Sequence, residues 1–263
     1  IYTFIHLYIY TFIHLYIYIF IYLYIYMNKS VTIKPILKGS GNNKYYYFID
    51  YPDFRPNLSP IEIIQMGSFG GGYFRDIQSS ICLDKNKNKK KFKSSEVISE
   101  FPKSWWKGID IPNMLTSSVY NKNVNKYGVK CGTSLEFWES KGWITKYDCY
   151  GWFQWYCRFF NGRRLPRAGK GGEDKGKIED ERQIKRWQGV CGEKGRFRNW
   201  LINDIYKKME KDKQEGKMNK RDGKARIKDY IEDYNISPVK RQTLQHWAYK
   251  INKKDYENLV KKK

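Results

Sequence analysis

The sequence predicts an α+β protein with a mostly helical body and a small N-terminal β hairpin. Two runs rich in β-branched and aromatic residues flank a Gly/Asn turn within residues 27–51. After residue 133, most segments repeat their apolar positions every three or four residues, which is the spacing of one helix face. Aromatic residues make up 17% of the chain and include nine Trp, so the side chains for a sizeable buried core are present.

The N-terminal third is expected to combine strands, turns and one short helix. VTIKPIL and KYYYFIDY, on either side of GSGNN, form the predicted hairpin. Ser59 followed by Pro60 has the residue types of a helix N-cap and a first helical position, so a short helix should follow and end at Gly67. The GSFGGGYFR run that begins at Gly67 is interpreted as a tight turn, and the Lys/Asn run at residues 84–95 as a solvated loop.

The rest of the chain is expected to be mainly helical. Thr133, with Glu136 three residues later, has the pattern of a capping box. GWFQWYCRFF at residues 151–160 is apolar on most sides, so this helix should be buried. Amphipathic helices are expected in EDERQIKRWQGVCG, RFRNWLINDIYKKM and SPVKRQTLQHWAYKI, and the last should use Ser237 as its cap and Pro238 as its first residue.

Residues 27–263 are interpreted as a single basic domain, because no boundary between two independent domains is evident. Its weakest points are stretches rich in Lys, Asn, Gly and acidic residues. These predict loop insertions near residues 84–95, 163–177 and 210–228.

Residues 1–26 form an uncharged, low-complexity repeat. YTFIHLYI occupies residues 2–9 and again residues 10–17, and YIFIYLYI follows at residues 18–25. Translated AT-rich repeat DNA upstream of Met27 is the favoured interpretation, because Tyr, Ile, Phe and Leu all have codons composed of A and T. A membrane helix is an alternative of suitable length, but its many Tyr would lie in the hydrocarbon core. A functional β segment is the third interpretation, because β-branched and aromatic residues alternate in the repeat. We therefore expect residues 1–26 to be absent from the mature protein, without membrane anchoring by this segment.

The charge of the chain favours a polyanionic partner. There are 50 Lys and Arg against 27 Asp and Glu, a formal charge of +23, and none of these residues lies in the opening repeat. Such a charge attracts nucleic acid first and acidic membrane surfaces second. A Lys-rich surface that merely reflects an AT-rich genome stays open as the alternative.

Cysteine and histidine usage argues against metal sites and histidine-based catalysis. The five Cys are odd in number and not spaced like a disulfide framework, and no secretory signal is evident. Reduced thiols and an intracellular location, nuclear or cytoplasmic, are therefore expected. His246 is the only histidine after Met27. No metal or cofactor is expected, because close pairing of the kind seen in zinc sites is missing from Cys131, Cys149, Cys157 and Cys191.

Five blocks together resemble an uncharacterised protein family of protists, fungi and large DNA viruses. They are PDFRPNLSP, GSFGGGYFRDI, NKYGVKCGTSLEFWESKGWI, YGWFQWYCRFF and SPVKRQTLQHWAYKI. The blocks occur in order over most of residues 51–251, after the opening repeat. The resemblance implies no reaction, because the family has no assigned activity.

A set of basic residues near tryptophans is the main site candidate and predicts a non-enzymatic nucleic-acid-binding protein. Basic side chains on helices whose other faces pack together would contact phosphates of DNA or RNA. The last amphipathic helix also carries Gln242 and His246, residue types that can contact base edges. The expected contact residues are Arg75, Arg158, Arg163, Arg164, Arg182, Arg186, Arg196, Arg198, Lys240 and Arg241.

Two further hypotheses stay open. In the first, the protein is a nucleotide- or nucleic-acid-processing enzyme that uses Asp50, Asp53 and Asp76 to hold Mg²⁺, with Arg75 beside them. The Gly-rich GSFGGGYFR backbone would approach phosphate there, although it lacks the GK[ST] of a P-loop. In the second, the protein is a structural or assembly protein that binds a protein partner through aromatic residues. The sequence leaves enzymatic activity and oligomeric state open.

Overall fold

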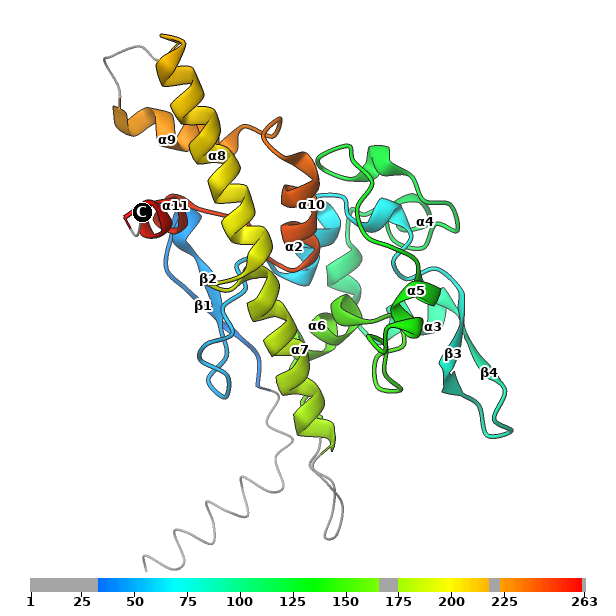
Figure 1. Ribbon diagram of the computed structural model, residues 1–263. Helices are drawn as coiled ribbons and strands as arrows, with labels where there is room; N and C mark the ends of the chain where they lie inside the picture. Colours follow the sequence, from blue (N-terminus) through cyan, green and yellow to red (C-terminus); the bar gives the residue numbers. More distant parts are fainter. Residues whose placement is uncertain (1–32, 166–174, 218–222, 262–263) are drawn as a thin grey trace, which may run out of the picture. The chain divides into compact units, whose positions relative to one another are not determined.

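A computed structural model describes residues 33–165, 175–217 and 223–261 (Figure 1). The described residues from Lys34 onward belong to one compact unit. The expectations for the opening repeat, and for the middle of the predicted insertions at residues 163–177 and 210–228, lie outside the described residues.

The predicted hairpin and the α+β class are confirmed. Strands β1 (Ile36–Lys38) and β2 (Tyr45–Tyr47) pair antiparallel, with a 3₁₀ turn at Gly41–Asn43 between them. A second antiparallel pair consists of β3 (Ile77–Leu83) and β4 (Lys89–Phe92). The remaining regular structure in the described residues is helical.

The prediction of a solvated loop over the whole Lys/Asn run is wrong. Only residues 84–88 connect strands, and Lys89–Phe92 pairs with β3 so that Lys91 lies opposite Gln78 and Phe92 opposite Ile77. Lysine has a low strand propensity, and the pairing depends on contacts of β3 with distant parts of the chain. The lysines of this run are nonetheless exposed, as the composition indicated.

Short helices and 3₁₀ turns fill the segment before the central helix. The helices are α2 (Pro60–Gln65), α3 (Ser94–Ser99), α4 (Ile111–Met114) and α5 (Leu135–Ser140), and the 3₁₀ turns are Phe69–Gly71, Lys103–Trp106 and Lys122–Val124. The Ser59 cap is confirmed, and Glu62 completes a capping box with it. The Thr133 cap is wrong by one residue, because Ser134 precedes the helix and its hydroxyl accepts from the Phe137 N–H at 3.3 Å.

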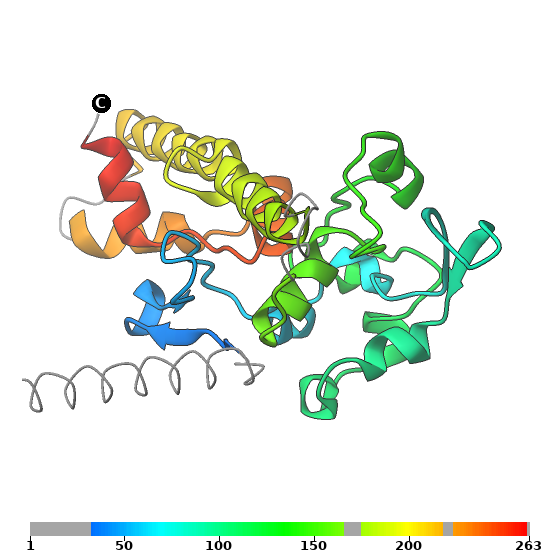
Figure 2. The ribbon, with the colours of Figure 1, turned by 90° about the horizontal axis from the view of Figure 1, so that it is seen from below.

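Longer helices make up the C-terminal part. They are α6 (Trp152–Phe160), α7 (Lys175–Cys191), α8 (Arg196–Gln214), α9 (Gly223–Glu232), α10 (Pro238–His246) and α11 (Lys253–Val260). Helix α8 packs against α7, α9, α10 and α11 (Figures 1 and 2). Ser237 precedes α10 as predicted, but its hydroxyl bonds Asp204 on α8 instead of capping its own helix. No helix in the described part of the chain has both the length and the apolar character needed to cross a bilayer.

Helix α6 lies in the core, as its composition predicted. Trp155, Tyr156 and Phe159 are fully buried, and Phe54 packs against all three. The polar tips within this aromatic core are hydrogen-bonded: the Tyr156 hydroxyl donates to the Leu58 carbonyl at 2.7 Å. Burial of large aromatic side chains with satisfied polar atoms is a strong source of stability.

The expectation that all thiols are reduced is contradicted by a disulfide between Cys82 and Cys149. The two residues are 67 positions apart in the sequence, and their Cα atoms lie 6.4 Å apart because β3 packs beside the segment that enters α6. Spacing along the chain gives no sign of such a contact. Cys131, Cys157 and Cys191 are free.

Candidate nucleic-acid interface

Most of the ten predicted contact residues are engaged within the fold. Six of them form ion pairs: Arg158 and Arg163 with Asp148, Arg164 with Asp50, Arg182 with Glu179, Arg198 with Asp255, and Lys240 with Asp204. A cation that already has a carboxylate partner gains less from a phosphate, because the existing pair must be broken. These six side chains therefore stabilise the fold, and each would have to leave its carboxylate partner to bind a ligand.

Asp148 is the buried centre of a network of ion pairs that includes Arg158 and Arg163. Only 1% of its side chain is exposed, and it accepts from Arg158 at 3.0 Å and from Arg163 at 2.7 Å. Arg158 also forms a two-bond contact with Glu100. The network joins the C-terminal end of α6 to the segment before it, and Arg158 and Arg163 therefore have a structural role.

The polar residues at the start of α10 also face inward. Arg241 is only 3% exposed and donates to the carbonyls of Ile231 and Ile236, which holds the end of α9 against α10. Gln242 and Gln245 are buried, and the Gln245 amide donates to the Gly67 carbonyl. These side chains are therefore not available to read base edges in this structure.

The glycine-rich turn is closely packed against its neighbours. Gly71 has a φ of +80°, and a Cβ at this position would lie 1.9 Å from the Asn113 carbonyl oxygen. The backbone N–H groups of Phe69 and Gly70 donate to His246 and Asn125. Since these N–H groups have partners within the protein, the geometry supports the tight-turn interpretation rather than a phosphate cradle.

The three aspartates proposed as catalytic are held in separate contacts. Asp50 pairs with Arg164. Asp76 accepts from the Ser94 backbone N–H and pairs with Lys93, and these two contacts, in that order, lower the pKa of Asp76 to about 2. Asp53 is exposed. In the part of the chain that the structure describes, no three acidic, His or Cys residues are grouped so that they could hold a metal ion.

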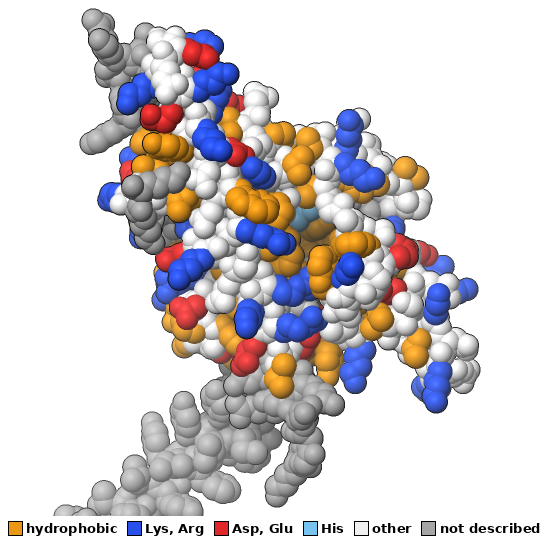
Figure 3. Space-filling view, viewed as in Figure 1, with side chains coloured by type: hydrophobic (Ala, Val, Ile, Leu, Met, Phe, Trp, Pro, Cys, Tyr) orange, Lys and Arg blue, Asp and Glu red, His pale blue; other side chains and the backbone are white. Residues whose placement is uncertain are grey.

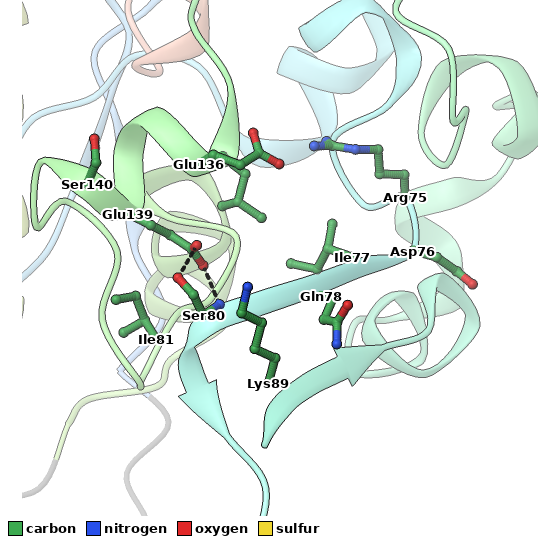
Figure 4. Close-up of a pocket in the computed structure, with 11 residues that line it drawn as sticks. Arg75, Asp76, Ile77, Gln78, Ser80, Ile81, Lys89, Glu136, Glu139 and Ser140 are labelled. Carbon is green, nitrogen blue, oxygen red and sulfur yellow. Dashed lines mark hydrogen bonds between the residues drawn. The ribbon is translucent and has the colours of Figure 1, made fainter. Parts of the chain in front are cut away.

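Arg75 lines a cleft of about 640 Å³ between the β3–β4 pair and α5 (Figure 4). Its guanidinium and the Glu136 carboxylate point toward one another, while Lys89 extends into the cleft from β4. Glu139 accepts from the Ser80 hydroxyl and backbone N–H on the opposite wall. Because the cleft mixes cations and carboxylates, its charges favour neither an anionic nor a cationic ligand.

The strands β3 and β4 with residues 84–88 form what we call the lysine ribbon, which the list of predicted contact residues omitted. Its lysines are exposed, and none has an ion-pair partner among the described residues: Lys85, Lys87, Lys89, Lys90 and Lys91. The single acid of the turn, Asp84, accepts from the backbone N–H groups of Asn86 and Asn88 at 2.8 and 2.9 Å. In the sequence, this segment is IQSSICL followed by a Lys/Asn turn and KKKF, without a regular alternation of apolar and polar residues.

The lysine ribbon is tied to the core at its base. Cys82 is joined to Cys149, and Glu139 on α5 accepts from the hydroxyls of both Ser79 and Ser80. Phe92 contacts the ring of Tyr150 with ring centroids 6.2 Å apart. Unneutralised charge is thus presented on a two-stranded support whose base is held by covalent, polar and aromatic contacts.

A second surface combines aromatic rings with a cation, and we call it the indole surface: Phe137, Trp143, Arg186 and Trp247. Phe137 and Trp143 are 40% and 39% exposed, and their ring centroids lie 5.9 Å apart. The Arg186 guanidinium lies 5.3 Å from the Trp143 ring and 5.5 Å from the Trp247 ring. Burial, and secondarily the charge of Arg182, lower the pKa of Arg186 to about 10, so it stays protonated at neutral pH.

Figure 3 shows the face of the molecule with α7 and α8 in front. Blue basic side chains and orange apolar ones alternate over α7 and beside it, around a hollow whose floor shows a pale-blue histidine. His246 is the only histidine among the described residues. Further blue side chains mark the lysine ribbon at the right edge of this view.

Comparisons with models of protein families, with curated proteins and with solved structures give no significant match to this chain. The resemblance to the uncharacterised family therefore stays a prediction, and the functional argument rests on the geometry of this molecule.

Proposed function

We propose that the protein binds nucleic acid through the lysine ribbon. The observation that supports this most directly is the group of five exposed lysines that have no ion-pair partner among the described residues. Lysines that neutralise phosphates release condensed counterions, which is the main source of non-specific affinity for DNA and RNA. The role is one of binding, and no metal or cofactor takes part in it.

The shape of the ribbon supports the same proposal. A two-stranded antiparallel ribbon fits the major groove of B-DNA, and its exposed side chains also suit the backbone of a single strand. The predicted helical contact residues are mostly paired with acids. The proposed interface is therefore centred on β3 and β4 and not, as the sequence predicted, on the helices. Four of the predicted residues have no carboxylate partner within ion-pair distance among the described residues: Arg75, Arg186, Arg196 and Arg241. Arg241 is buried, whereas Arg196 is exposed.

An intracellular location, nuclear or cytoplasmic, follows in this proposal from the nucleic-acid partner alone, because the Cys82–Cys149 disulfide removes the argument from reduced thiols. A membrane partner does not belong to it.

The alternative that the lysines only reflect genome composition is tested with matched variants. The ribbon variant replaces all five ribbon lysines by Gln, which lowers the formal charge from +23 to +18 (23 − 5). The control variant makes the same change at exposed lysines without an ion pair to the described residues, on and around α8 and α11: Lys194, Lys207, Lys213, Lys254 and Lys261.

Binding of a labelled oligonucleotide is measured by fluorescence anisotropy at low salt. We expect the ribbon variant to bind at least about tenfold more weakly than the wild type, and the control variant to stay within about threefold. Equal losses in the two variants would mean that net charge alone attracts nucleic acid. Absence of binding by the folded wild type would refute the proposed function.

A further inference from the structure

Arg186 on α7 is a half-buried cation without a carboxylate partner. Its Nη1 donates to the Trp143 carbonyl at 3.2 Å and to Gln183 Oε1 at 3.1 Å, whereas Nε and Nη2 have no acceptor among the described residues. Three of the five guanidinium N–H bonds are therefore left for another molecule. The Nε and Nη2 edge is the edge that binds the two oxygens of a phosphate in parallel.

The neighbouring charge strengthens the case for an anion. Burial, and then Arg182 one turn earlier on α7, disfavour the charged form of Arg186. Glu179 favours the charged form, but its carboxylate is paired with Arg182. Lys185 is exposed on the same helix, and Lys141 lies over the Phe137 ring at 5.5 Å. An anion bound to Arg186 would relieve the repulsion between these cations.

Trp143 offers a partly exposed indole in a fixed position. Its backbone N–H donates to the Trp138 carbonyl at 2.9 Å, and its own carbonyl accepts from Arg186. The preceding carbonyl, of Gly142, accepts from Arg182 at 3.3 Å. Because both α5 and α7 hold this turn, an aromatic ring stacked on Trp143 would lose little freedom to ordering of the protein.

We propose that the indole surface binds one nucleotide of a single strand, with its base stacked on Trp143 and its phosphate on Arg186. A base inside a duplex has no free face, so the nucleotide must be unpaired. Stacking on an aromatic side chain beside an arginine is a general way to hold single strands without reading their sequence. This inference rests on the proposed function and specifies the class of nucleic acid as single-stranded, with the lysine ribbon contacting further phosphates.

An apolar segment of a protein partner fits the same surface less well. Burial of Arg186 beneath it would leave the remaining guanidinium N–H groups without acceptors and a charge without a partner. The nucleotide supplies both the aromatic face and the anion that these groups need.

The test separates stacking from phosphate attraction with two probes. One is an oligothymidylate of about 12 nucleotides, a length within the range of common single-strand sites, and the other is an abasic oligomer of equal length. The variants are Trp143→Ala and, as a matched control, Trp200→Ala, which removes an indole that is 47% exposed on α8. Thermal unfolding confirms that each full-length variant is folded.

We expect Trp143→Ala to bind oligothymidylate at least about fivefold more weakly and the abasic oligomer within about twofold of the wild type. Trp200→Ala should bind both like the wild type. Arg186→Lys should weaken binding of both probes, because the bidentate contact to phosphate is lost.

Unchanged binding of oligothymidylate by folded Trp143→Ala would overturn the stacking site, and so would an equal loss in Trp200→Ala. In either case the lysine ribbon could still account for binding if the ribbon variant had lost affinity. Failure of the wild type to bind either probe would instead refute the proposed function together with this inference.

Discussion

His246 makes a specific prediction about stability at mildly acidic pH. Its Nε2 accepts from the Phe69 backbone N–H at 3.1 Å, so this nitrogen is unprotonated, and the Gln242 amide lies 3.0 Å from the same atom. The imidazole stacks on the Phe69 ring with centroids 4.1 Å apart. Burial lowers the pKa of His246 from 6.5 to about 3.

Because the folded-state pKa lies below the unfolded-state pKa, the unfolded chain takes up the proton first. The stability linked to His246 is therefore complete above the unfolded value and decreases as the pH falls from about 6.5 toward 3. These two pKa values correspond to a loss of about 2 kcal/mol between pH 7 and pH 5. Such a loss is a large fraction of the stability of an ordinary domain.

The assay is urea unfolding of the wild type and of His246→Gln at pH 7 and pH 5. The glutamine amide oxygen is able to accept the Phe69 N–H, and it does not titrate. We expect the free energy of unfolding of the wild type to fall by about 2 kcal/mol more than that of the variant. A parallel fall in both proteins would refute this account of His246. An NMR titration in which the His246 ring protonates near pH 6.5 in the folded protein would refute it independently.

Further predictions concern the turn, the ion-pair network and the disulfide. Gly71→Ala should lower the free energy of unfolding by more than about 2 kcal/mol, because Gly71 has a left-handed φ and a carbonyl oxygen lies where the Cβ would be. Gly128 also has a left-handed φ but open space around it, so Gly128→Ala should lower this free energy by only about 1 kcal/mol. Similar urea midpoints for the two variants would contradict this prediction. Asp148→Asn should lower the free energy of unfolding by about 3–5 kcal/mol, since two arginines lose their buried carboxylate partner. A decrease below about 1 kcal/mol in the same urea assay would rule out a structural role for these ion pairs. Cys82→Ser should lower the free energy of unfolding by up to about 4 kcal/mol, since the disulfide closes a loop with a sequence separation of 67. A melting temperature equal to that of the wild type under non-reducing conditions would argue against the disulfide.

Local patterns predicted those parts of the fold that depend on neighbours in the sequence. The hairpin, the Ser59 cap and the buried helix α6 follow from turn residues, capping chemistry and an apolar run. Pairing of Lys89–Phe92 with β3 and the Cys82–Cys149 bond depend instead on contacts between distant segments. Those contacts leave no periodic signal in the sequence.

The basic residues of the candidate site likewise have ion-pair partners that the sequence does not reveal. The sequence shows that Arg158 and Arg198 are basic, but not that Glu100, Asp148 and Asp255 lie beside them in the fold. The predicted contact residues include Arg75, Arg186 and Arg196, which form no ion pair with the described residues. They do not include the ribbon lysines, because a lysine run resembles a solvated loop. The unpaired cations are thus found only when each one is checked for its partner in space.

The central claim is that phosphates are bound by the lysine ribbon, and its most direct test is the salt dependence of binding. For a single strand, the slope of log K against log salt changes by about 0.7 for each phosphate that a cation neutralises. We therefore predict that removal of the five ribbon lysines makes the slope less steep by up to about 3.5, while the control variant changes it by less than about 1. A ribbon variant with the slope of the wild type would show that these lysines do not contact phosphate and would contradict the account.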